Sequence, residues 1–255
     1  MIKTYVDDNS IENTINDIIQ SFNNSGKIFW QKRNTIKVFD VGDELWNVKS
    51  FQKPHLINRF AYKYVRKSKA RRSFEYGKKL LQKGILTPKP LGYVEYSNLI
   101  GLTNSFYVSK NLNYDLNFEK LIDENYPDRV RILEQFTEFT HLLHEKQIHH
   151  FDHSKGNTLI CKKGEGKYDF YLIDLNRMKF EKMDYQQRID NFNRLSLTPS
   201  MIQIIGKKYA SIIGVDEEKV IRDITASCEK FKAFSGRKSK WKKIIGKDLA
   251  SGSGQ

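Results

Sequence analysis

The chain has 255 residues, of which 39% are hydrophobic, and a formal net charge of +14. This indicates a globular protein, and no apolar run approaches the roughly 18 residues of a membrane span. The opening segment, MIKTYVDDNSIENT, carries acids where a secretion signal would be basic and apolar, so we expect a cytoplasmic protein. Cys161 and Cys228 form no disulfide framework or metal motif and are expected as free thiols.

The positive charge is concentrated in two segments. Residues 59–83 hold ten lysines and arginines against one acid, Glu75, and residues 231–247 hold seven with none. Such clusters favour an acidic partner, which is a nucleic acid, an anionic membrane surface or a phosphorylated substrate, and they are equally compatible with a solvated surface. The charge alone does not distinguish an acidic partner from a solvated surface.

Three short segments suited to strands follow an N-terminal extension, residues 1–19. They read KIFW, TIKVFDV and ELWNVKSF, with Arg33-Asn34 and Gly42-Asp43 supplying the turns between them. This pattern predicts an antiparallel meander within residues 27–53.

The next segment, SKARRSFEYGKKLLQKG, has helical spacing. Ala70, Phe74, Gly77 and Leu81 recur on one face, and Gly84 stands where a helix ends. Two strand-like runs, LGYVEY and SFYVSKN, follow a proline-containing break. Five strands and one helix therefore predict a small lobe over residues 20–110.

The chain from residue 111 to 230 reads as a second, mainly helical lobe. Residues 129–146 have the spacing of a helix that buries one face, and it leads into the loop HHFDHSKGN. TLI and FYLID then form a hairpin expected to bring Asp174 back towards Asp152 and Asn157. Residues 231–250 form a basic tail, and residues 251–255, SGSGQ, have the composition of a linker remnant.

These elements resemble the bilobal α+β fold of protein kinases. His150-Phe151-Asp152 is similar to the kinase H-x-D motif, Asn157 falls at its asparagine position, and Asp174-Leu175-Asn176 stands where D-F-G would be. Lys49, in NVKSF, matches the lysine of the third kinase strand. Glu75 matches the glutamate of the helix that pairs with it.

The resemblance implies ATP-dependent phosphoryl transfer, in which an enzyme positions groups and neutralises charge. Lys49 would contact the α- and β-phosphates of ATP, held in place by Glu75. Asp174 and Asn157 would bind Mg²⁺, and Asp152 would orient and deprotonate the acceptor hydroxyl.

Two further parts of the nucleotide site follow from the resemblance. No glycine-rich loop separates the first two strands, so Arg33 and Asn34 are the candidates to cover the phosphates. The backbone of Val108, Ser109, Lys110 and Asn111 corresponds to the kinase hinge, which would hold the adenine.

Within this superfamily, residues 27–200 are most similar to lipopolysaccharide kinases, which phosphorylate Kdo or heptose. No A-P-E segment follows Asp174, and this absence points to an acceptor smaller than a protein. The resemblance implies an ATP-dependent kinase acting on a Kdo hydroxyl of a lipid A precursor, at the inner face of the cytoplasmic membrane. The basic segments agree, because an anionic bilayer attracts each lysine or arginine by ~1 kcal/mol. Trp241, Ile244 and Ile245 would then form an interfacial anchor, or the tail is simply basic and disordered.

Several alternatives stay open at this point. One alternative concerns the acceptor, which would be a heptose instead of Kdo. Two others concern the class of protein, which would be a RIO-like serine/threonine kinase or an ATP-binding pseudokinase. Another alternative is a nucleic-acid-binding module. Its only support is that four aromatic residues lie among basic residues, Phe60, Tyr62, Tyr64 and Phe74. We therefore expect no nucleic acid partner. Glu75 is also compatible with surface ion pairs to Arg71 and Lys79. The five histidines of residues 141–153 lack the spacing of a zinc site.

Overall fold

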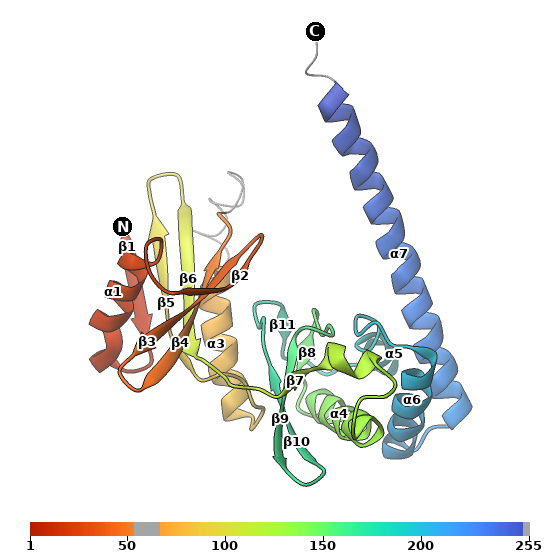
Figure 1. The fold of residues 1–255 in the computed structure, drawn as a ribbon. Helices are drawn as coiled ribbons and strands as arrows, with labels where there is room; N and C mark the ends of the chain where they lie inside the picture. Colours follow the sequence, from red (N-terminus) through yellow and green to blue (C-terminus); the bar gives the residue numbers. More distant parts are fainter. Residues whose placement is uncertain (54–66, 252–255) are drawn as a thin grey trace. The chain divides into compact units, whose positions relative to one another are not determined.

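The computed structural model describes residues 1–53 and 67–251, with side chains described as far as residue 237. Residues 59–66 of the first basic segment, including Phe60, Tyr62 and Tyr64, lie outside the described part. The chain divides into two compact units (Figure 1). Unit 1 comprises Met1–Asp115, Leu159–Cys161 and Asp169–Met178, and unit 2 comprises Leu116–Thr158, Lys162–Tyr168 and Lys179–Gln255.

Unit 1 is built on a six-stranded antiparallel sheet. Its strands are β1 (Ile2–Val6), β2 (Lys27–Gln31), β3 (Thr35–Val41), β4 (Glu44–Phe51), β5 (Pro90–Ser97) and β6 (Leu102–Lys110), in the order β1-β5-β6-β4-β3-β2. The five strands expected from the sequence are all present. Residues 1–19, expected only as an extension, supply the sixth strand and most of helix α1 (Glu12–Ser21), preceded by a short 3-10 helix, Asn9–Ile11.

The two faces of this sheet are covered by different helices (Figure 1). Helix α1 packs its apolar side on one face, where its isoleucines form a core with Trp46, Val48, Phe106 and Val108. Helix α3 (Lys69–Gln82) covers part of the other face through Ala70 and Phe74, which pack on Phe51 and Tyr93. Because strand side chains alternate between faces, Lys49 lies on the α3 face and Ser50 on the α1 face.

Lys37 of β3 fixes the end of α1. Its side chain is only 7% exposed, and its ammonium donates hydrogen bonds to the carbonyls of Phe22 (2.6 Å) and Ser25 (2.8 Å). A cation at a helix C-terminus satisfies carbonyls that have no partner within the helix and complements the helix dipole. Lys37 therefore ties the segment that follows α1 to strand β3.

Helix α3 approaches the sheet closely at Gly77. A Cβ atom placed there would lie 2.6 Å from Pro90 Cγ and 3.3 Å from Leu175 Cδ1. Ser68 caps the start of the helix by accepting a hydrogen bond from the Arg71 amide at 3.0 Å. Gly77 thus lets α3 pack against the residue that follows Asp174.

Unit 2 is mainly helical. Its helices are α4 (Arg129–Glu145), α5 (Tyr185–Asp190), α6 (Pro199–Ile213) and α7 (Glu217–Ser251), with a 3-10 helix, Phe118–Ile122. The short strands of this half of the chain are β7 (Leu116–Asn117), β8 (His149–His150), β9 (Thr158–Gly164), β10 (Lys167–Leu172) and β11 (Met178–Lys179). β9 and β10 form the expected hairpin, whose residues are divided between the two units.

The helices of unit 2 end where the sequence supplies caps. Asp184 and Gln187 form a capping box at the start of α5, Thr198 caps α6, and Gly214 ends α6 with φ of +67°. The buried face of α4 includes Ile132, Leu133, Phe136 and Leu143, as its spacing predicted. A mixed α+β protein with an N-terminal antiparallel sheet and a helical C-terminal part is therefore confirmed.

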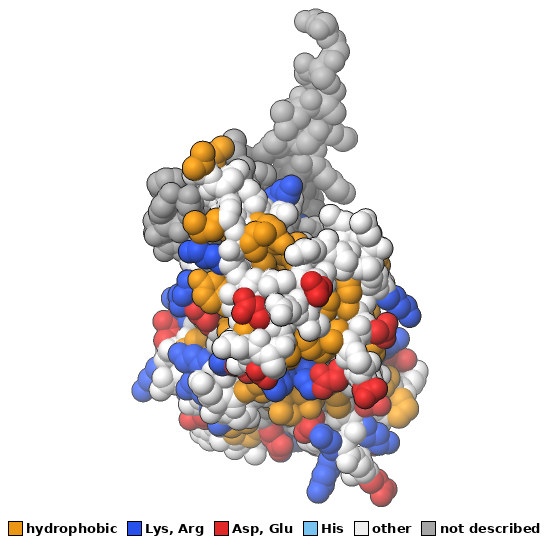
Figure 2. Space-filling view, turned by 90° about the vertical axis from the view of Figure 1, so that its left-hand side faces the viewer, with side chains coloured by type: hydrophobic (Ala, Val, Ile, Leu, Met, Phe, Trp, Pro, Cys, Tyr) orange, Lys and Arg blue, Asp and Glu red, His pale blue; other side chains and the backbone are white. Residues whose placement is uncertain are grey.

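The second basic segment is part of α7 rather than an irregular tail, since the helix continues to Ser251. The side chains of Trp241, Ile244 and Ile245 lie outside the described part, so the anchor stays a prediction. No described helix is both long and apolar enough to cross a membrane. Figure 2 shows basic and acidic side chains interspersed with apolar ones over the described part of one face, so the net charge is not gathered there.

Candidate active site

Lys49 and Asp174 lie together in unit 1. Lys49 Nζ is 2.7 Å from Asp174 Oδ1, and the two side chains are 14% and 29% exposed. The register of the sheet places Lys49 beside Ile36 of β3 and Tyr107 of β6. Its ammonium also lies 5.3 Å from the centre of the Phe51 ring. The structure therefore brings together the cation and one of the carboxylates that the sequence analysis selected.

The backbone at Asp174 has a left-handed conformation that is uncommon for residues other than glycine, although aspartate tolerates it better than most. Its φ is +56°, and Asn176 Nδ2 donates a hydrogen bond to Asp174 Oδ1 at 2.6 Å. The strand before it is anchored to unit 1, because the Thr87 hydroxyl donates to the Leu172 carbonyl at 2.8 Å. Such left-handed residues cost free energy and concentrate at functional sites. Packing of Leu175 beside Gly77 holds the segment in place.

A further cation, Lys69, interacts with Asp174, and several arginines lie near Lys69. Lys69, at the start of α3, is half-buried, and burial lowers its pKa. Repulsion from Arg33, Arg177 and Arg72 lowers this pKa further, whereas attraction to Asp174 opposes it. An accumulation of cations around Lys69, beside the Asp174 carboxylate, suits a polyanionic ligand such as a triphosphate. Arg33 was selected from the sequence for phosphate contact, and Lys69 and Arg177 were missed.

A sequence signal for Lys69 exists. The first turn of α3 contains no acidic residue and carries Lys69, Arg71 and Arg72. Cations are unfavourable near a helix N-terminus, where the helix dipole is positive. Arg71 has an ion pair with Glu75, and Arg72 donates to the Ser68 carbonyl. Lys69 is therefore the residue of this turn that favours a function other than helix stability.

Glu75 does not hold Lys49 in this structure, which corrects that expectation. Its carboxylate oxygens lie 2.7 Å from Lys67 Nζ and 2.8 Å from Arg71 Nε. Partial burial would raise the pKa of Glu75, but the hydrogen bonds from Lys67 and Arg71 lower it. The buried positions of α3 are Ala70, Ser73, Phe74, Gly77 and Leu80, so Glu75 lies off the face that packs on the sheet. The ion pair with Arg71, weighed as the alternative, is present.

The predicted adenine-binding segment lies at the end of β6. Val108 and Ser109 are buried between β4 and β5, the Lys110 amide donates to the Lys89 carbonyl at 2.9 Å, and the Asn111 amide donates to the Leu45 carbonyl at 2.7 Å. These two amides are therefore engaged within the protein. Adenine binding by this segment stays a prediction.

Asp152 and Asn157 lie together in unit 2. Asn157 Nδ2 donates to the Asp152 carbonyl at 2.8 Å, and the Asp152 amide donates to His150 Nδ1 at 3.0 Å. Arg194 Nη1 is 3.3 Å from Asp152 Oδ1, and its guanidinium lies 4.9 Å from the centre of the Phe231 ring. The carboxylate is 26% exposed, so it is accessible to a substrate hydroxyl.

A buried polar network supports this loop. Asn191 Nδ2 donates to the His150 carbonyl at 3.0 Å, His144 Nε2 lies 3.4 Å from Asn191 Oδ1, and His144 Nδ1 lies 2.8 Å from the Tyr209 hydroxyl. Burial lowers the pKa of His144 to about 3, so this imidazole is neutral at physiological pH. The network explains two of the clustered histidines without a metal. No described cluster of histidine, cysteine and acidic residues is arranged to hold a metal ion.

Comparison with known proteins decides the family. The model of the Lipopolysaccharide kinase (Kdo/WaaP) family matches residues 17–215, most of the chain. The chain belongs to this family. It is accordingly a lipopolysaccharide core kinase, an ATP-dependent phosphotransferase, as the resemblance implied.

The fold agrees with a solved lipopolysaccharide kinase. A structure described as WaaP in complex with acyl carrier protein matches with a TM-score of 0.61 and 15% identity, covering 93% of this chain and 98% of that one. At this identity the likeness concerns the fold alone. No curated protein matches the sequence significantly.

The oxygen donors of this lipopolysaccharide kinase fit a magnesium ion. Mg²⁺ prefers carboxylate, carboxamide and phosphate oxygens. Donation from Asn157 Nδ2 to the Asp152 carbonyl assigns the amide orientation and leaves Oδ1 as the acceptor oxygen. Asp174 presents a partly exposed carboxylate. Asp174 belongs to unit 1 and Asn157 to unit 2, so their joint use stays a prediction.

Sequence reasoning missed the supporting residues Asn191, Arg194 and Tyr209. They lie 34 or more positions beyond the catalytic loop, outside any kinase motif. Only the packing of α5, α6 and their connection against α4 brings them to the loop.

Proposed function

We propose that this lipopolysaccharide kinase transfers the γ-phosphoryl group of ATP to a hydroxyl of Kdo on a lipid A precursor. The observation that carries the proposal is the match of residues 17–215 to a family named for Kdo kinases, joined to the contact of Lys49 with Asp174 at 2.7 Å. Heptose is the competing acceptor within the same family. The choice between Kdo and heptose depends on the residues that contact the sugar.

The proposed reaction uses Asp152 as the general base. Its carboxylate accepts the proton of the acceptor hydroxyl while the hydroxyl oxygen forms a bond to the γ-phosphorus. The bond from that phosphorus to the β,γ-bridging oxygen breaks, and ADP leaves with the electron pair. Arg194, in contact with Asp152, keeps the carboxylate oriented. The Asn157 bond to the Asp152 carbonyl restrains the loop backbone.

Lys49 and its cationic neighbours stabilise charge in this scheme. The Lys49 ammonium neutralises the α- and β-phosphate oxygens, and Lys69 adds positive charge beside Asp174, with Arg33 and Arg177 near Lys69. These side chains take over the role that a glycine-rich loop plays in protein kinases. Bound Mg²⁺, held by Asp174 and Asn157, would neutralise phosphate charge.

We place the reaction at the inner face of the cytoplasmic membrane. A lipid A precursor is membrane-embedded, and the basic residues of α7 favour an anionic surface. An acyl carrier protein is a further candidate partner, because the matching WaaP structure contains one.

The test incubates the purified chain with ATP and magnesium and either Kdo-bearing lipid A, heptose-bearing Kdo-lipid A or lipid A lacking both sugars. Mass spectrometry of the lipid reads the result. We expect one phosphate on Kdo-lipid A, none on lipid A, and loss of transfer in Asp152→Asn. Phosphate found only on the heptose would reassign the acceptor. Transfer only to a protein would favour a RIO-like kinase, and ATP binding without any transfer would favour a pseudokinase.

A further inference from the structure

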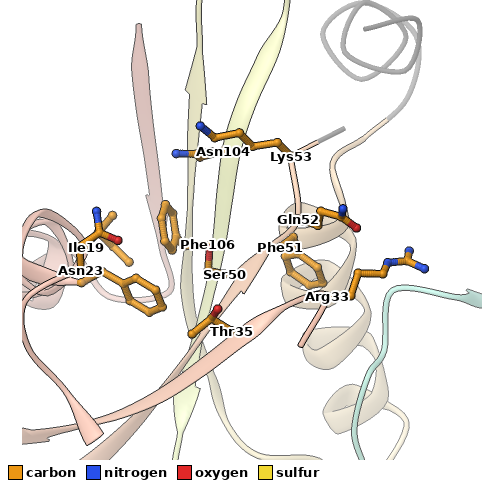
Figure 3. Close-up of a pocket in the computed structure, with 11 residues that line it drawn as sticks. Ile19, Asn23, Arg33, Thr35, Ser50, Phe51, Gln52, Lys53, Asn104 and Phe106 are labelled. Carbon is orange, nitrogen blue, oxygen red and sulfur yellow. The ribbon is translucent and has the colours of Figure 1, made fainter. Parts of the chain in front are cut away.

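A cavity lies in unit 1, beyond the end of α1 (Figure 3). It has a volume of about 320 Å³. Its lining comes from α1, the turn before β3, and strands β3, β4 and β6, and comprises Ile19, Phe22, Asn23, Arg33, Thr35, Ser50, Phe51, Gln52, Lys53, Asn104 and Phe106. Phe22, at one side of the cavity, is held in place by the hydrogen bond from the Lys37 ammonium to its carbonyl.

The floor of the cavity is a row across three neighbouring strands. Thr35 is paired with Ser50, and Ser50 with Phe106, so their side chains project from the same face. Phe22 closes one side, with its ring 5.2 Å from that of Phe106. Two hydroxyl groups and an aromatic edge thus form a rigid surface, fixed by strand pairing.

Every polar side chain around this floor can donate a hydrogen bond. Two are cations, Arg33 and Lys53, and the lining contains no acidic residue. Figure 3 shows Lys53 and Asn104 at one end of the cavity and Arg33 and Gln52 beside each other. Within the described part of the chain, the side chains of Asn23, Arg33, Thr35, Ser50, Gln52, Lys53 and Asn104 form no hydrogen bond or ion pair.

This combination fits an oxyanion carried on a small polar body. Arginine and lysine bind phosphate through charge-assisted hydrogen bonds, and hydroxyl and amide groups complete the set. Cavities of ~300 Å³ lie at the small end of ligand sites, which corresponds to a single sugar rather than a nucleotide. We propose that this cavity binds a phosphate-bearing ligand of monosaccharide size.

The floor of the proposed site lies on the opposite face of the sheet from Lys49, although Arg33, which lies near Lys69, also lines the cavity. Ser50 follows Lys49 in β4, and successive side chains of a strand point to opposite faces. Lys49 belongs with the α3 side, where Phe51 packs, and the floor belongs with the α1 side, where Phe106 packs. The inference therefore goes beyond the proposed function and does not depend on which sugar the kinase phosphorylates.

The test is a titration of the isotopically labelled full chain with glucose 6-phosphate at constant ionic strength, followed by amide resonances. We expect shifts at Thr35, Ser50 and Asn104, weaker shifts of the same amides with inorganic phosphate, and none with glucose. Saturating ADP should leave these shifts in place. Equal shifts with glucose, or displacement of the sugar phosphate by ADP, would overturn the proposal.

Variants separate this cavity from general charge attraction. Loss of one charge-assisted hydrogen bond should weaken binding about tenfold or more in Lys53→Gln, with a smaller loss in Asn104→Ala. Lys3→Gln, which removes an exposed lysine of β1 outside the cavity, should bind glucose 6-phosphate like the unaltered chain. Equal affinity in Lys53→Gln and Lys3→Gln would overturn the assignment, and unchanged spectra elsewhere would verify that each variant is folded.

Discussion

Lys49 Nζ contacts Asp174 Oδ1 at 2.7 Å, across 125 positions of sequence. The lysine is the candidate for binding phosphate and the aspartate the candidate for binding metal, and here each neutralises the other. A polyphosphate that attracts Lys49 therefore leaves the Asp174 carboxylate without its cation unless a metal ion replaces it. This relationship couples the two binding events electrostatically.

Lys49→Met should lower kcat/KM for ATP by about 10²-fold or more, because it removes a fixed cation from a partly buried site. Glu75→Gln is the comparison variant. It should change kcat/KM by less than about threefold, because it removes only the surface ion pairs of Glu75 with Lys67 and Arg71, each of which contributes ~1 kcal/mol or less. Steady-state kinetics with varied ATP measures both. If Glu75→Gln were as damaging as Lys49→Met, the two residues would pair during catalysis.

Asp152→Asn should reduce kcat by roughly 10²–10⁴-fold, the range for loss of a general base, while ATP binding stays unchanged. The substitution keeps the shape of the side chain and removes its ability to accept a proton. Calorimetric titration with ATP and single-turnover transfer assays separate the two effects. Undiminished transfer by Asp152→Asn would remove this residue from the role of base.

Arg194→Met should lower kcat by about tenfold with little change in the KM for ATP, because a displaced catalytic group costs up to ~10² in rate. Arg194 touches Asp152 and Phe231 of α7, so it acts on the base through position. Arg194→Lys, which retains the charge, should recover part of the rate. A rise in the KM for ATP alone would instead indicate a nucleotide contact.

Stability should fall as the pH drops below about 6.5, the ordinary value for an unfolded histidine. Burial lowers the pKa of both His144 and His153 to about 3, so the folded protein binds fewer protons than the unfolded chain between these values. Each histidine then removes up to ~1.4 kcal/mol of stability per pH unit as the pH falls through this window. Urea unfolding at pH 7, 6 and 5 measures the slope, which His153→Leu should reduce. An unaltered slope in that variant would contradict the prediction.

Gly77→Ala should destabilise unit 1 by about 1–3 kcal/mol, the usual range for overpacking a core. The added Cβ would lie 2.6 Å from Pro90 Cγ. Gly236→Ala, in α7 with nothing within 4 Å, should stabilise that helix by up to ~1 kcal/mol. Thermal unfolding compares the pair, and equal melting temperatures for the two variants would show that α3 can shift without cost.

The elements of this kinase follow closely from local sequence. Strands β2, β3 and β4, helix α3 and helix α4 could be predicted because apolar spacing, turn residues and caps act within a few positions. β1 and α1 were not predicted as part of the sheet, because the pairing of Ile2–Val6 with β5 joins residues some 90 positions apart. No local pattern encodes such a contact.

Motifs in the linear sequence were sufficient to select the candidate residues for the chemistry. The order Lys49, Asp152, Asn157 and Asp174 on their elements identified a kinase, since phosphoryl transfer needs a cation, oxygen ligands and a base. The partners of these residues came from the three-dimensional packing: Asp174 rather than Glu75 for Lys49, and Arg194 for Asp152. An ion pair forms wherever the packing of whole elements brings opposite charges together, and the helical register of α3 places Glu75 off the face that packs on the sheet.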